Sequence, residues 1–99
     1  KDIPKIIIAY EPVWAIGDKA PGTMDPGELS QYILFIKKVL ADMFGRKALD
    51  HIPLLYGGSV DSNNARELFS GTGIRGFLVG RTSLNIRSFE AMARSLIQK

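Results

Sequence analysis

A chain of 99 residues with 45% hydrophobic and 23% charged side chains is long enough for one small globular domain, which we expect to span residues 1–99. The absence of cysteine excludes disulfides, thiolate zinc sites and cysteine nucleophiles, and a single histidine, His51, excludes a histidine-clustered metal site. The net charge of +3 is spread along the chain without a basic cluster, so we expect no nucleic-acid partner.

The first residues carry none of the features of a targeting sequence. Residues 1–5 lack the charged, apolar and small-residue order of a signal peptide, and Lys1 stands where an initiating Met is expected. The sequence contains no apolar run of about 18 residues, the length that a membrane span requires. We therefore expect a cytoplasmic protein without a membrane partner and with a cut or processed start.

The first predicted unit is a strand followed by a long helix. Residues 6–10 (Ile-Ile-Ile-Ala-Tyr) form an apolar run rich in β-branched side chains, which predicts a buried parallel strand. After a loop over residues 12–24, Asp25 is placed to cap a helix. Apolar residues then recur at spacings of three and four as far as Phe44, and Gly45 follows as the C-cap.

A second unit has the same pattern of strand, glycine-rich turn and helix. Residues 52–56 predict a short apolar strand, and residues 57–59 (Gly-Gly-Ser) predict a turn. We expect Asp61 or Ser62 to cap a helix that reaches about Ser70.

A third unit completes the chain. Residues 76–79 predict a strand, residues 80–83 a turn, and residues 86–97 an amphipathic helix. Strands that alternate with helices predict an α/β fold with a parallel sheet. The outer strands of a three-stranded sheet lack a neighbour on one side, so we expect the chain to associate with a second copy or with another polypeptide.

Residues that could carry chemistry follow each of the three strands: Glu11, then Gly57 to Ser59, then Gly80 and Arg81. The carboxyl ends of parallel strands share one edge of a sheet, and ligands bind there. Glu11 offers a general base, and the glycine-bearing turns offer backbone amides to an anion such as phosphate. The alternatives are a solvated acid and glycines that serve only to make tight corners.

The loop over residues 12–24 is apolar and contains Trp14. Apolar side chains on a loop favour a lid that packs over a bound ligand. The alternative is a loop that is docked permanently on its own domain.

Residues 9–17 (Ala-Tyr-Glu-Pro-Val-Trp-Ala-Ile-Gly) closely resemble the signature of the triosephosphate isomerases. Residues 56–60 (Tyr-Gly-Gly-Ser-Val) are similar to that family's seventh loop, and residues 76–80 with Ser83 and Leu84 resemble its eighth strand and phosphate turn. The resemblance covers practically the whole chain but only the last three of the family's eight βα units. It implies a partial (β/α)8 TIM barrel made of three parallel βα units.

The resemblance implies a role for each matched residue. Glu11 matches the catalytic base, which moves a proton between adjacent carbons as dihydroxyacetone phosphate and glyceraldehyde 3-phosphate interconvert through an enediolate, without metal or cofactor. The amides that match the phosphate-binding site are those of Gly17, Ser59, Gly80 and Arg81. The first part of the closing lid is matched by Pro12, Val13, Trp14, Ala15, Ile16 and Gly17. The residues that hold the lid shut are matched by Tyr56 and Ser59.

Some features of the family have no match in this chain. Its electrophilic lysine and histidine, and an asparagine, come from the N-terminal half of the barrel, and His51 precedes a strand at the wrong end for a site. Residues 18–24 are longer than the family's usual hinge, and Arg81 stands where a small residue is common, so its guanidinium either contacts phosphate or points to solvent.

Two hypotheses about partners follow from these departures. In the first, a complementing N-terminal barrel half restores isomerase activity toward triose phosphate, and the chain alone is nearly inactive. In the second, the chain is a non-catalytic, self-associating homo-oligomer that binds inorganic phosphate weakly.

Overall fold

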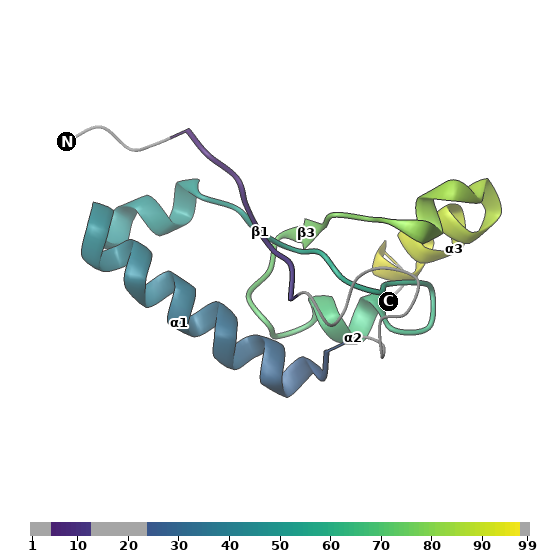
Figure 1. Ribbon diagram of the computed structural model, residues 1–99, viewed down its shortest axis with the longest axis horizontal. Helices are drawn as coiled ribbons and strands as arrows, with labels where there is room; N and C mark the ends of the chain where they lie inside the picture. The colour runs from purple at the N-terminus through teal and green to yellow at the C-terminus, as the bar shows by residue number, and fades with distance from the viewer. Residues whose placement is uncertain (1–4, 13–23, 98–99) are drawn as a thin grey trace.

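The computed structural model describes residues 5–12 and 24–97, in which three strands form one parallel sheet (Figure 1). The strands are β1 (Ile8–Tyr10), β2 (Leu54–Tyr56) and β3 (Gly76–Phe77). They lie in the order β1-β2-β3, with Tyr10 opposite Tyr56 and Tyr56 opposite Phe77. The predicted parallel order is therefore confirmed, and the residues that follow the three strands share one edge of the sheet.

The strands are shorter than the sequence predicted. The first begins at Ile8 and not at residue 6, because Pro53 on the neighbouring strand has no amide hydrogen to donate and ends the ladder. The third ends at Phe77 and not at residue 79, although the Leu78 amide still donates to the Tyr56 carbonyl at 2.9 Å. The second begins at Leu54 and not at residue 52. The preceding residue, Pro53, still accepts a hydrogen bond through its carbonyl from the Ile8 amide at 3.0 Å.

The long helix α1 (Pro26–Phe44) has the ends that the sequence predicted. The carboxylate of Asp25 accepts a hydrogen bond from the amide of Glu28 at 3.1 Å, which satisfies one of the free donors of the first turn. At the other end Gly45 adopts a φ of 91°, a conformation that side chains disfavour, and its amide donates to a carbonyl of the last turn. Local signals alone therefore set both boundaries of this helix.

The second helix, α2 (Ala65–Phe69), starts later than predicted, and neither Asp61 nor Ser62 caps it. The Asp61 amide donates to the side-chain oxygen of Asn64 at 2.9 Å, and the Asp61 carboxylate accepts from the Asn63 amide at 2.8 Å. These are the bonds of a helix cap, and the Ala65 amide also donates to the Asp61 carbonyl at 3.0 Å, so Asp61 caps the single turn that leads into α2 and not α2 itself.

The last helix, α3 (Ile86–Ile97), agrees with the prediction. Two 3-10 helices were not predicted: η2 (Arg46–His51) precedes β2, and η3 (Arg81–Leu84) follows β3. Within the described ranges, no helix has the length and apolar character needed to cross a membrane.

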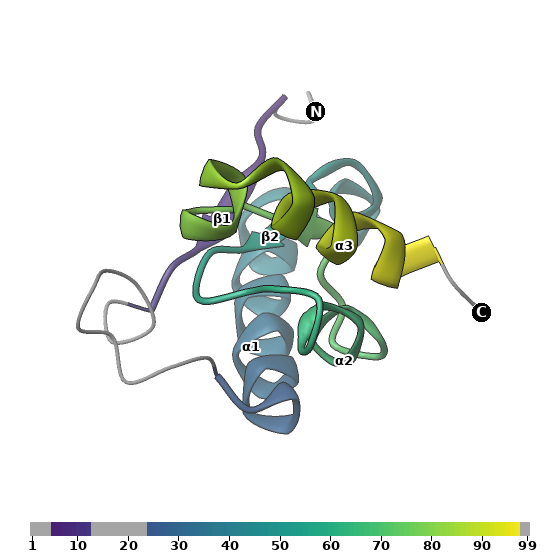
Figure 2. The same cartoon turned by 90° about the vertical axis from the view of Figure 1, so that its right-hand side faces the viewer.

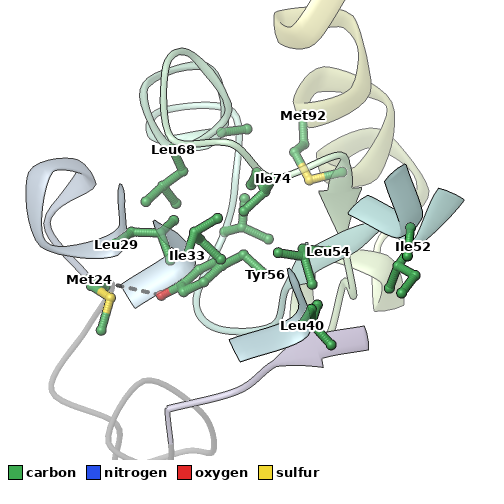
Figure 3. Close-up of a cluster of buried hydrophobic side chains, with 13 residues drawn as sticks. Met24, Leu29, Ile33, Leu40, Ile52, Leu54, Tyr56, Leu68, Ile74 and Met92 are labelled. Carbon is green, nitrogen blue, oxygen red and sulfur yellow. Dashed lines mark hydrogen bonds between the residues drawn. The ribbon is translucent and has the colours of Figure 1, made fainter. Parts of the chain in front are cut away.

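The core lies where the helices meet the sheet. α2 lies beside the N-terminal half of α1 in both views, and it also contacts α3 (Figures 1 and 2). Tyr56 on β2 is fully buried and points among the side chains of Leu29 and Ile33 of α1 and Leu68 of α2 (Figure 3). The remaining buried hydrophobic side chains are Met24, Leu40, Ala48, Ile52, Leu54, Val60, Ala65, Ile74 and Met92.

Candidate functional site

The carboxyl ends of the three strands open into one pocket with a volume of about 390 Å³. Glu11, directly after β1, forms part of its wall, together with residues 57–61 after β2 and residues 78–82 after β3. The structure therefore brings together Glu11, Ser59, Gly80 and Arg81, which the sequence placed at three separate strand ends. What these residues bind remains a prediction.

Gly57 gives the Glu11 side chain its place in the pocket. A Cβ atom on Gly57 would lie 2.6 Å from Cγ of Glu11 and 3.3 Å from its Oε1. The Gly57 amide also donates to the Tyr10 carbonyl at 2.9 Å, which holds the start of this turn against the end of β1. The carboxylate therefore rests on a backbone surface that any other residue at position 57 would obstruct.

Gly58 has a similar relation to Tyr56. A Cβ atom on Gly58 would collide with the Tyr56 hydroxyl and the adjoining ring carbon. That hydroxyl accepts a hydrogen bond from the Met24 amide at 3.1 Å, and both residues are buried. The Tyr56 ring also lies edge-on to Phe77. Tyr56 thus connects the pocket wall to Met24, which follows the predicted lid in the sequence.

Replacing Tyr56 with Phe is expected to destabilise the chain by about 1–3 kcal/mol, because the buried Met24 amide loses its acceptor. Urea unfolding, followed by circular dichroism, measures this difference. The control is Tyr32→Phe, since Tyr32 is 46% exposed, and a change within about 0.5 kcal/mol is expected there. Equal stabilities of Tyr56→Phe and the parent chain would contradict a stabilising role for this bond.

The predicted lid lies mostly beyond the residues that the structure describes. Pro12 is buried at the end of the described segment that carries Glu11. Val13, Trp14, Ala15, Ile16 and Gly17 fall outside the described residues. The predicted lid and the predicted phosphate contact of Gly17 therefore stay expectations.

The turn after β3 is held by two hydroxyl groups whose partners could not be predicted from the sequence. The Ser83 hydroxyl donates to the Gly80 carbonyl at 2.5 Å, and the Thr82 hydroxyl donates to the Val60 carbonyl at 2.6 Å. On the neighbouring turn, the Asn64 side chain donates to the Ser59 carbonyl at 3.1 Å. Serine, threonine and asparagine commonly bond to the backbone in turns, but their sequence positions do not reveal which carbonyl they reach.

The charged residues that line the pocket are the acids Glu11 and Asp61 and the base Arg81. Burial raises the pKa of the Tyr10 hydroxyl, and the neighbouring phenols and a carboxylate act in the same direction, so this residue is uncharged at neutral pH, as an unperturbed tyrosine is. The pocket lining thus carries two negative side chains and one positive side chain. Because the side chains give no net positive charge, the backbone amides of the turns are the principal groups that could attract an anion here.

His51 lies away from this pocket. It is exposed at the end of η2, before the amino end of β2, as its position in the sequence predicted. Among residues 5–12 and 24–97, no cluster of histidine, aspartate and glutamate side chains is arranged to hold a metal ion.

The family model of triosephosphate isomerase matches residues 1–96. The chain belongs to the triosephosphate isomerase family. Similar curated relatives are the triosephosphate isomerases of Chlorobium phaeobacteroides, 43% identical over 97% of this chain, and Mycoplasma genitalium, 44% identical over 93%. That of Dehalococcoides mccartyi is 46% identical over 90% of this chain.

The chain spans little more than a third of these triosephosphate isomerases, with 38%, 37% and 34% of their lengths matched. The three parallel βα units are therefore a partial TIM barrel, as the sequence predicted. These three units contribute Glu11 and the two glycine-bearing turns that line the pocket.

Proposed function

We propose that this chain supplies the base and the phosphate-binding turns of a cytoplasmic triosephosphate isomerase and becomes active when an N-terminal barrel portion completes it. The observation that carries the proposal is the common pocket formed by Glu11 and the two glycine-bearing turns. Membership of the triosephosphate isomerase family supports the same reaction.

In the proposed reaction, the Glu11 carboxylate removes a proton from the carbon next to the substrate carbonyl. The electron pair of that bond moves to the carbonyl oxygen, and an enediolate forms. A proton also moves from the hydroxyl oxygen of the first carbon to the former carbonyl oxygen, and Glu11 returns its proton to the neighbouring carbon, so dihydroxyacetone phosphate becomes glyceraldehyde 3-phosphate without loss or gain of atoms. A base within hydrogen-bond reach of this carbon is the main requirement, and the side-chain-free surface of Gly57 leaves Glu11 room for it.

The phosphate group of the substrate is proposed to bind to the backbone amides of Ser59, Gly80 and Arg81, with Gly17 as a further donor. Successive amides in a glycine-bearing turn form a concave surface that suits an anion. Ser59, Gly80 and Arg81 line the pocket that contains Glu11, so a phosphate held there would leave the carbon chain near the carboxylate.

The completing partner is proposed to be the N-terminal portion of a TIM barrel, which would supply the electrophile at the substrate carbonyl. Within the described sheet β1 and β3 pair only with β2, so both leave an edge for further strands. The outer face of α1 carries exposed apolar side chains that fit packing against another helix. These are Tyr32, Phe35, Val39 and Met43, which are 41% to 64% exposed.

A coupled isomerase assay, with and without a separately produced N-terminal barrel portion, tests the proposal. The chain alone is expected to be nearly inactive, because each missing donor to the developing oxyanion costs on the order of 10²- to 10³-fold in rate. The mixture is expected to turn over triose phosphate. No activity above buffer in a mixture whose measured mass shows the complex would contradict the proposal.

The exposed apolar face of α1 also favours a second candidate function, a non-catalytic assembly of identical chains. Light scattering of the purified chain separates the two. A defined oligomer that the N-terminal barrel portion does not dissociate supports self-assembly, whereas a stable monomer at micromolar concentration contradicts it.

A further inference from the structure

A single side chain connects the two turns that line the pocket. The Thr82 hydroxyl in η3 donates to the backbone carbonyl of Val60 at 2.6 Å, in a partly buried hydrogen bond. Val60 itself is buried, with only 5% of its surface exposed. The bond thus joins the turn after β2 to the turn after β3, two segments that belong to different βα units.

The bond lies next to the amides that the proposed function assigns to phosphate. Val60 directly follows Ser59, and Thr82 directly follows Arg81. The strand pairing ends at Tyr56, whose carbonyl accepts from the amide of Leu78 at 2.9 Å. Beyond this point the sheet no longer sets the distance between the two segments, whereas the Thr82 hydroxyl still connects them.

Ser83 provides a contrast within the same turn. Its hydroxyl donates to the Gly80 carbonyl at 2.5 Å, and its amide donates to the same carbonyl at 3.0 Å. Both bonds close the turn on itself and reach no other βα unit. Loss of the Ser83 hydroxyl therefore affects one turn, whereas loss of the Thr82 hydroxyl affects the distance between two turns.

We propose that Thr82 is a positioning residue that sets the separation of the Ser59 and Arg81 amides, and so the fit of a phosphate group between them. The inference rests on the proposed function. Thr82 acts through the Val60 carbonyl, so it needs no contact with the substrate. Donors fixed in advance at the correct spacing bind an anion more tightly than donors that are ordered on binding.

Titration of the 15N-labelled chain with inorganic phosphate, followed through the amide signals of Ser59 and Arg81, tests this role. In the parent chain both signals are expected to shift with phosphate. Thr82→Val keeps the shape but removes the hydroxyl, and its Kd for phosphate is expected to rise about 2- to 12-fold, the range that corresponds to one hydrogen bond. Thr82→Ser restores the hydroxyl and is expected to stay within about twofold of the parent.

The control is Ser95→Ala, which removes a hydroxyl bond to the Met92 carbonyl within α3, away from the residues that line the pocket, and is expected to leave the Kd within about twofold. Thr82→Ala serves as a second variant if the valine variant does not fold. Equal Kd values for the parent chain and a folded Thr82 variant without the hydroxyl would overturn the positioning role alone. If the amides of the parent chain do not respond to phosphate, the proposed phosphate site fails, and the positioning role fails with it.

Discussion

Glu11→Gln is expected to lower the kcat of the complemented isomerase by about 10²- to 10⁴-fold, the usual contribution of a general base. Gln has the shape of Glu but does not accept a proton at neutral pH. The phosphate-binding amides lie on other turns of the same pocket, so the affinity for substrate is expected to change much less than kcat. A coupled assay over a range of triose phosphate concentrations separates the two effects.

The matched control is Glu67→Gln, which makes the same chemical change at an exposed position on α2, outside the pocket. Its kcat is expected to equal that of the parent within experimental error. A complemented Glu11→Gln protein that turns over at the parent rate would remove Glu11 from the mechanism.

Gly57→Ala is expected to reduce kcat by about 10²-fold, because a new Cβ atom would lie 2.6 Å from Cγ of Glu11 and displace the carboxylate. A shift of about 1 Å in a catalytic group can cost this much in rate. The added methyl group carries no charge and removes no backbone amide, so the loss is expected in kcat more than in affinity for phosphate. Steady-state kinetics of the complemented protein measure the loss.

A double variant shows whether Gly57 acts through Glu11. In a background that already carries Glu11→Gln, Gly57→Ala is expected to cause little further loss of kcat, because both changes remove the same function. If the two losses instead multiply, Gly57 affects the reaction by a route that does not involve Glu11.

The long helix illustrates what the sequence alone can predict. Asp25 and Gly45 bound α1 by interactions with residues at most four positions away in the chain, so their effect is visible in the sequence. The order of strands and helices was predictable for a similar reason, since each strand is an apolar run between turn residues.

The turn before α2 illustrates what was missed. Asp61 caps a single turn, in which its carboxylate accepts from the Asn63 amide and its own amide donates to the Asn64 side chain, and α2 begins only after this turn, at Ala65. The sequence shows that each of these side chains can form such bonds, but not which of them form.

The candidate site also has features that were predictable and features that were not. Glu11 and the glycine turns were predictable because parallel strands bring their carboxyl ends to one edge. The contact of Glu11 with Gly57 and the bond from Thr82 to Val60 were not predicted, because each joins segments from different βα units at a spacing that only the folded chain sets.

The most direct test of the account is the exchange of deuterium from D2O into dihydroxyacetone phosphate, catalysed by the complemented protein and followed by proton NMR. This exchange reports proton removal at the carbon itself, whether or not product is released. The account predicts rapid incorporation of deuterium with the parent chain and loss of nearly all of it with Glu11→Gln. Incorporation that is absent with the complemented parent, or that persists unchanged in Glu11→Gln, would contradict it.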